Sequence, residues 1–273
     1  MKLFAATLVF TTLSLVSSAQ YFYNDILTTA QTNKQFALLK ENNVGKVTAI
    51  SHEADGSITQ HFFLQQVLNS SKTEVTTTAE YPSTGNSISV STYLDNKIIR
   101  TVDSVDRIKS TVDYTYEGNR LKTISMLTED KSMNSVSKEQ HQWFYEDDLP
   151  VKMLVIKGEN DTTTVNFVKE EHGNIGEEHW IKKGVKVQNY FYYYDDQHRL
   201  TDIVRFNPRA SRLLPDFLFT YDENGNVSTF TQVSGAGNYM IWKYLYGPNG
   251  LKQKEILFNK EKQLVGTVEF SYF

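Results

Sequence analysis

FTYDENGNVSTF, the stretch from Phe219 to Phe230, contains two short strand patterns separated by a turn. Apolar or β-branched residues alternate with polar ones on both sides of the turn, as they do in half-buried strands. Asn224-Gly225 supplies residues that tolerate positive φ, which tight hairpin turns require. The stretch therefore predicts an antiparallel β-hairpin.

The same pattern recurs along the chain as an aromatic residue, any residue, Tyr, a polar turn, and then an aliphatic residue that opens the next strand. Successive aliphatic markers stand 23 to 28 residues apart, at Ile98, Leu121, Leu149, Ile175, Leu200, Val227 and Leu251. Such a period fits one hairpin with its return connection. We predict an all-β fold, an antiparallel meander of about 14 strands that forms a curved or twisted extended sheet.

The composition agrees with a folded, strand-rich chain. Its 273 residues are 40% hydrophobic and 22% charged, and 16 Tyr and 16 Phe favour pleated surfaces over helices. Before the repeats, Asn24 to Lys40 has near-helical apolar spacing and is followed by Asn42-Asn43, so a short helix is expected there.

The first residues, MKLFAATLVFTTLSLVSSAQ, have the three parts of a secretory signal, with Lys2 ahead of an apolar run and Ala19 at the cleavage position. The apolar run is shorter than the ~20 residues of a spanning helix, so a cleaved signal peptide is favoured over a membrane anchor. We predict residues 1–19 as signal peptide, 20–45 as a helical cap and 46–273 as the hairpin repeat. The mature chain is then exported, periplasmic or extracellular, with no transmembrane segment.

The repeat unit resembles the YD repeat of the RHS family and, more weakly, the MORN-like repeats of YwqK-type proteins. The residues that carry the resemblance are Tyr221, Asp222, Asn224, Gly225 and Asn226. The resemblance covers about Tyr93 to Phe273. It implies a β-sheet shell or an extended sheet that contains or contacts another molecule, without catalytic residues in the repeat.

Pairs of acids such as Asp147-Asp148, Asp195-Asp196 and Asp222-Glu223 are candidates for glycosidic cleavage, which needs two carboxylates about 5 to 9 Å apart. All three occupy nearly the same position of the repeat, where acids serve hairpin turns. We therefore predict no catalytic residues and no cofactor. The formal net charge of −4, with mixed signs along the chain, also argues against a nucleic-acid partner.

A weak metal candidate lies in the sequence EEHGNIGEEH. On a strand Glu177 and His179 share a face, and the turn at Gly173-Asn174 could bring His172 close to them. Metal sites usually take three or four ligands and no further His lies at diagnostic spacing, so solvated turn and strand residues explain the cluster better and no metal is predicted.

Five consecutive aromatics, from Tyr190 to Tyr194, put rings on both faces of one predicted strand. One face belongs to the core, and the other offers flat apolar area with polar tips to a ligand unless the fold covers it. The speculative binding residues are Tyr190, Tyr192, Tyr193 and Tyr194.

Together these features favour a non-enzymatic exported binding or scaffolding protein of the cell envelope, whose partner is a glycan, a peptide or a protein. Three alternatives stay open: a polysaccharide-acting hydrolase with carboxylates assembled by the fold, an accessory subunit of a larger surface or toxin-type complex, and an outer-membrane β-barrel. Glu269 and Lys122 interrupt strand faces that such a barrel would keep free of charge.

Overall fold

The computed structural model describes residues 20–81, 85–207, 211–234 and 237–273. The predicted signal peptide, residues 1–19, lies outside the described residues. Contacts divide the chain into two compact units. Unit 1 is the chain up to Glu139 together with Tyr246–Lys254 and Thr267–Phe273, and unit 2 is Gln140–Leu245 with Glu255–Gly266.

The N-terminal helix is present as a π-helical turn, η1 (Phe22–Leu27), that continues into α1 (Thr28–Glu41). It ends where the sequence predicted. Asn43 has φ +53°, and the Asn42 side chain donates its Nδ2 to the carbonyl of Leu38 at 2.8 Å. An amide side chain on a carbonyl of the last turn and a left-handed residue beyond it are common ways to terminate a helix.

Eighteen strands follow within the described part of the chain. Their bounds are β1 (Lys46–Glu53), β2 (Phe63–Leu68), β3 (Glu74–Tyr81), β4 (Gly85–Leu94), β5 (Lys97–Val105), β6 (Ile108–Glu117), β7 (Arg120–Asp130), β8 (Ser135–Glu146), β9 (Leu149–Lys157), β10 (Asp161–Lys169), β11 (Ile175–Lys182), β12 (Val185–Tyr194), β13 (Leu200–Asn207), β14 (Arg212–Tyr221), β15 (Val227–Val233), β16 (Tyr239–Tyr246), β17 (Lys252–Phe258) and β18 (Leu264–Tyr272).

The predicted open sheet of about 14 strands is wrong. Each strand pairs with its neighbours in sequence, and β18 also pairs with β1, so the hydrogen-bonded order returns from the last strand to the first. The closing contacts are backbone hydrogen bonds: Phe273 accepts from Gly45 at 2.6 Å and from Lys46 at 2.9 Å, and it donates to Lys46 at 2.9 Å. Closure satisfies the edges that an extended sheet would leave unpaired.

The strand number differs because the repeat markers begin too late in the chain. The seven markers open or immediately precede β5, β7, β9, β11, β13, β15 and β17, so they account for the strands from β5 onward. The four strands before them, between Lys46 and Leu94, follow the same hairpin order without a clear marker. The hairpin itself is confirmed, since β14 and β15 pair antiparallel across Asn224-Gly225.

A common turn explains the acids of the repeat. Asp222 accepts backbone N–H groups of Asn224 and Asn226 at 2.9 and 2.8 Å, and Gly225, at φ +79°, donates its N–H to the carbonyl of Asp222. Asp195 and Glu170 make the same pair of bonds in their own turns. Carboxylates at these positions stabilise the turn by accepting otherwise unpaired backbone donors.

The repeat Tyr has a role that its aromatic ring alone does not suggest. Its hydroxyl donates to the carbonyl of the aliphatic marker one hairpin earlier in the chain. The bonds run from Tyr116 to Ile98 at 2.9 Å, from Tyr194 to Ile175 at 2.8 Å and from Tyr221 to Leu200 at 2.6 Å. These three repeats are thereby tied to their predecessors by a side chain as well as by the backbone ladder.

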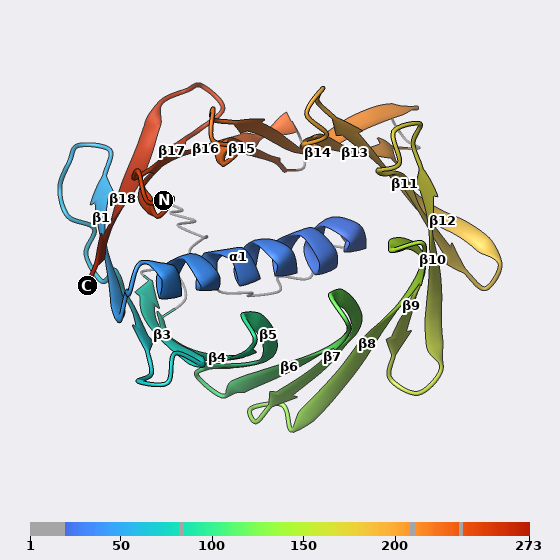
Figure 1. The fold of residues 1–273 in the computed structure, drawn as a ribbon, viewed down its shortest axis with the longest axis horizontal. Coiled ribbons are helices and arrows are strands. Elements are labelled where there is room, and N and C mark those ends of the chain that lie inside the picture. Colours follow the sequence, from blue (N-terminus) through green and yellow to red (C-terminus); the bar gives the residue numbers. More distant parts are fainter. Residues whose placement is uncertain (1–19, 82–84, 208–210, 235–236) are drawn as a thin grey trace. The chain divides into compact units, whose positions relative to one another are not determined.

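In unit 1, α1 packs against the sheet beside β4 and β5 (Figure 1). Phe36 stacks on Tyr93 with ring centroids 3.7 Å apart, and the amide oxygen of Asn33 accepts the backbone N–H of Ile98 at 2.8 Å. Both helix residues therefore fix α1 on the face that also buries Ile98 and Leu251.

Candidate functional site

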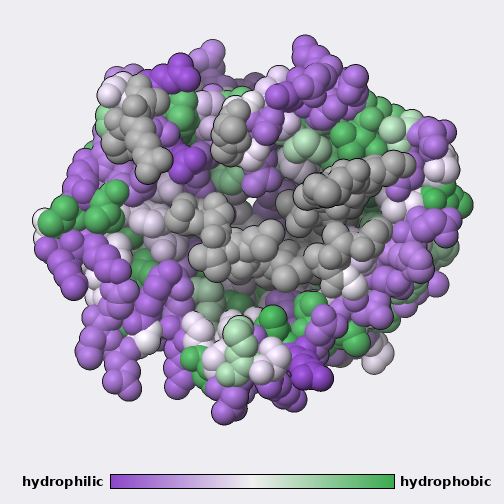
Figure 2. Space-filling view, turned by 180° about the vertical axis from the view of Figure 1, so that it is seen from behind, coloured by the Kyte–Doolittle hydropathy of each residue, from purple (hydrophilic) through white to green (hydrophobic). Residues whose placement is uncertain are grey.

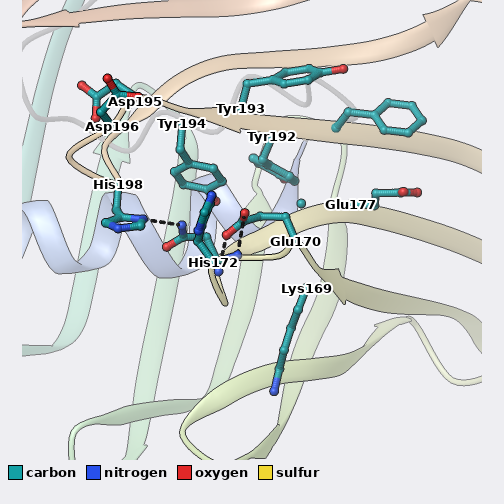
Figure 3. Close-up of a pocket in the computed structure, with 13 residues that line it drawn as sticks. Lys169, Glu170, His172, Glu177, Tyr192, Tyr193, Tyr194, Asp195, Asp196 and His198 are labelled. Atoms are coloured by element: carbon teal, nitrogen blue, oxygen red, sulfur yellow. Dashed lines mark hydrogen bonds between the residues drawn. The ribbon is translucent and has the colours of Figure 1, made fainter.

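A groove of about 610 Å³ opens in unit 2 along β11 and β12, next to the turns that precede β11 and β13 (Figure 3). It combines four acids, two imidazoles and aromatic rings. The lining residues are Lys169, Glu170, His172, Asn174, Gly176, Glu177, Phe191, Tyr192, Tyr193, Tyr194, Asp195, Asp196 and His198. The volume is within the range of small-ligand sites.

Two of the acids are ionised turn residues. Backbone hydrogen bonds, the largest from His172, lower the pKa of Glu170, and the hydrogen bond from Arg199 lowers the pKa of Asp195. Glu170 is also tightly packed, because a Cβ on Gly176 would meet the Cβ of Glu170 at 3.0 Å. The groove therefore carries fixed negative charge on both neighbouring turns.

Two imidazoles lie at the same end of the groove. The rings of His172 and His198 meet edge to face with centroids 5.6 Å apart. His198 Nδ1 lies 3.4 Å from the side-chain amide of Asn174, which links the two turns (Figure 3). The turn before β11 and the turn before β13 thus form one wall of the groove.

The outward face of β11 and β12 supplies aromatic rings to the groove. Phe191 lies directly opposite Glu177 in the ladder, so the two side chains share a face. Tyr193, two residues along β12, is 47% exposed and points away from the other tyrosines (Figure 3). An exposed ring beside a carboxylate is a suitable surface for an apolar or cationic group that also carries hydrogen-bond donors.

The other face of the same strands carries buried tyrosines. Tyr190 and Tyr192 are buried, and the hydroxyl of Tyr192 donates to Oε2 of Glu178 at 2.5 Å. Nε1 of Trp180 donates to the other oxygen of Glu178 at 2.6 Å. Burial, followed by the charge of Glu178, raises the pKa of Tyr192 well above its usual value.

The four tyrosines singled out from the sequence therefore separate. Tyr193 is exposed on the groove, Tyr194 lines it half-buried, and Tyr192 lines it as a buried residue, whereas Tyr190 is buried and does not line it. Rings on both faces of β12 follow the predicted alternation. A role in binding for these residues stays a prediction.

The metal candidates are only partly brought together. Nε2 of His179 and Oε2 of Glu177 lie 2.6 Å apart on the outward face, as the alternation predicted. His172 instead lies 3.2 Å from Glu171 and faces His198. Among the described residues no group of three or more His, Cys, Asp or Glu side chains could hold a metal ion.

Sequence reasoning missed two residues of this region. Glu178 was overlooked because it stands between Glu177 and His179, although the same alternation that pairs those two points Glu178 inward. Asn174 was treated only as a turn residue. Comparison of its position with that of Arg199, in the corresponding turn before β13, is the signal that could have found it.

Replacement of Asp195 by Asn should remove stability that depends on pH. The folded-state pKa of Asp195 is lowered, so its contribution is present above the unfolded value of about 3.9 and is lost as pH falls through the folded pKa. Urea unfolding at pH 7 should show Asp195→Asn less stable than the native chain, with the difference shrinking at pH 3. Asp196→Asn is the matched control, and a difference independent of pH would contradict the assignment.

Within the described residues, no helix is both long and apolar enough to cross a membrane. No protein-family model matches the chain, and no curated protein matches it. The resemblance to YD repeats therefore stays a prediction.

Among solved structures, a porin-like protein from Bacteroides uniformis matches with 8% identity over 84% of this chain and 98% of that chain, at a TM-score of 0.39. A porin-like protein from Bacteroides vulgatus matches with 12% identity over the same shares, at 0.31. The Tc holotoxin pore of Photorhabdus luminescens matches with 10% identity over 78% of this chain and 16% of that chain, at 0.23. At TM-scores below 0.5 these matches establish neither a shared fold nor a shared function.

Proposed function

We propose that the chain is an exported, non-enzymatic binding protein of the cell envelope that takes its ligand in the groove along β11 and β12. The observation that carries this proposal is the groove of about 610 Å³ with the half-exposed ring of Tyr193 beside it. Concave sites with a few convergent polar groups are where proteins hold ligands. The signal peptide predicted from the sequence supports an exported location.

The charges in the groove support binding over hydrolysis. A glycosidase needs one carboxyl group with a raised pKa to act as general acid. In this groove the pKa values of Glu170 and Asp195 are lowered, and both side chains are used by backbone N–H groups of their turns. Carboxylates held in this way accept hydrogen bonds and attract cations but do not donate protons near neutral pH.

The outer-membrane barrel alternative gains from the closed strand order. Charged residues on β6 argue against this alternative. The face of β6 that carries Asp113 also carries Lys109 and Glu117. Asp113 forms an ion pair with Arg100 at 2.8 Å, and both side chains are about half exposed. Lipid-facing strands need a band of about 25 Å without charge, and β6 has charge along its length. Figure 2 shows hydrophilic residues with smaller hydrophobic patches between them on the visible face, which does not present the strand faces.

Tyr193→Ala tests the proposal. A panel of envelope glycans and peptides is screened for binding to the native chain, and the affinity for any ligand found should fall about tenfold or more in the variant. Tyr192→Ala is unsuitable, because Tyr192 is buried and bonded to Glu178.

Leu245→Ala is the matched control, since Leu245 is 51% exposed in unit 2 and does not line the groove. It should leave affinity unchanged. A ligand that binds native protein and both variants equally would place the binding surface elsewhere, and a panel without any ligand would end the proposal.

A further inference from the structure

In two hairpins of the chain, a basic side chain lies over the ring of the repeat Tyr. The guanidinium of Arg199 lies 4.6 Å from the ring centroid of Tyr221, and Nζ of Lys97 lies 5.5 Å from that of Tyr116. In both cases the basic residue directly precedes the marker whose carbonyl accepts the Tyr hydroxyl. The repeat thus has a position for a cation over the ring.

The Arg199 position also has an anionic partner. Nη2 of Arg199 lies 2.7 Å from Oδ2 of Asp195, the acid that begins the same turn. The guanidinium is therefore held between a carboxylate and an aromatic face, an arrangement that suits its planar, delocalised charge.

The hairpin at the groove has the same parts with one exception. Tyr194 donates its hydroxyl to the carbonyl of Ile175, and Glu170 begins the turn as Asp195 does. The residue directly before Ile175 is Asn174, which is shorter than Arg199 and neutral. At this hairpin the chain's own residue supplies no cation over the ring, and Tyr194, Glu170 and Asn174 all line the groove.

The other charges around this position are complementary to a cation. Asp196 lines the groove together with the ionised Glu170, whereas Glu177 is paired with His179 and lies apart from Tyr194 (Figure 3). Lys169 lines it too, but its amino group points away from the other labelled side chains (Figure 3). A positively charged ligand group over Tyr194 would therefore meet carboxylates on more than one side.

We propose that the groove binds an arginine side chain of a partner peptide, with its guanidinium over Tyr194 and against Glu170, as Arg199 lies over Tyr221 and against Asp195. This inference rests on the proposed function and names its ligand class. A guanidinium fits better than an ammonium because it stacks on the ring and bonds a carboxylate through two N–H groups at once.

The test uses a capped tri-arginine peptide and its neutral tri-citrulline counterpart, titrated into the full chain by calorimetry at low salt. In Asn174→Arg, the chain's own guanidinium takes the position over Tyr194 that Arg199 takes over Tyr221 in the turn before β13. The arginine peptide should bind native protein about tenfold or more tightly than the citrulline peptide, and Asn174→Arg should lose that affinity.

Asn226→Arg is the matched control. Asn226 holds the same place in the turn of Asp222, bonds the acid of that turn at 3.1 Å, and does not line the groove. It should bind the peptide as native protein does. Equal binding of arginine and citrulline peptides, or full affinity in Asn174→Arg, would overturn the inference.

A glucosamine oligomer separates this inference from the proposal on which it rests. If the oligomer binds in a Tyr193-dependent manner and the arginine peptide does not bind, the groove is a binding site but its ligand class is not a basic peptide. Failure of every glycan and peptide removes both.

Discussion

Deletion of Ser271 to Phe273 is expected to destabilise the chain by about 3 to 5 kcal/mol. The deletion removes the three backbone hydrogen bonds between Phe273 and the Gly45-Lys46 segment. It also removes Tyr272, whose hydroxyl donates to the carbonyl of Lys252 at 2.5 Å and whose ring packs on the core around Phe36. Urea unfolding measures the loss.

The same deletion exposes unpaired strand edges on β1 and on the shortened β18. Free edges pair with other chains, so light scattering should show association that the native protein lacks. Phe273→Ala is the control. It keeps the backbone bonds and loses only the ring that lies 4.8 Å from Nζ of Lys46, which costs about 1 kcal/mol or less. A truncated chain as stable and as monomeric as Phe273→Ala would show that the β1–β18 pairing does not hold the sheet closed.

Glu178→Leu should destabilise unit 2 by about 3 kcal/mol or more. The carboxylate is fully buried and accepts hydrogen bonds from the Tyr192 hydroxyl at 2.5 Å and from Nε1 of Trp180 at 2.6 Å. Leucine provides no acceptor, so two interior donors lose a partner, and each loss costs about 1 to 3 kcal/mol.

Glu178→Gln separates hydrogen bonding from volume, because it keeps the size of the side chain and one acceptor oxygen. It should be less destabilising than Glu178→Leu in the same urea titration. Tryptophan fluorescence, to which Trp143, Trp180 and Trp242 all contribute, is compared between the two variants. If leucine is tolerated as well as glutamine, the buried carboxylate is not a structural acceptor.

Closure illustrates what local patterns leave undecided. Alternation and turn residues specify which strands pair as neighbours along the chain, and every hairpin pattern specifies only this local pairing. Whether the last strand meets the first depends on the accumulated twist and coiling of all the strands between them, and Gly45 and Phe273 have no special sequence signature. The first four strands were missed for a related reason, since they lack the Tyr-turn-aliphatic marker.

The groove was predictable only in part. Alternation along the stretch from Tyr190 to Tyr194 correctly places rings on both faces, but sequence alone does not say which face is the interior. Burial in the folded chain decides this, because Tyr190 and Tyr192 are buried, and the register places Glu178 opposite Tyr190 on the same face. The exposed ring is therefore Tyr193, and the buried carboxylate is Glu178.

The sequence by itself determined the hairpin repeat, the short N-terminal helix and the turn role of the acids, because these depend on contacts within a few residues or within one hairpin. Only the tertiary structure decided the closed strand order, the tyrosine hydroxyls tied to the preceding hairpin, and the meeting of two turns at the groove. Those features join residues about twenty or more positions apart, where chain geometry rather than local preference sets the partner.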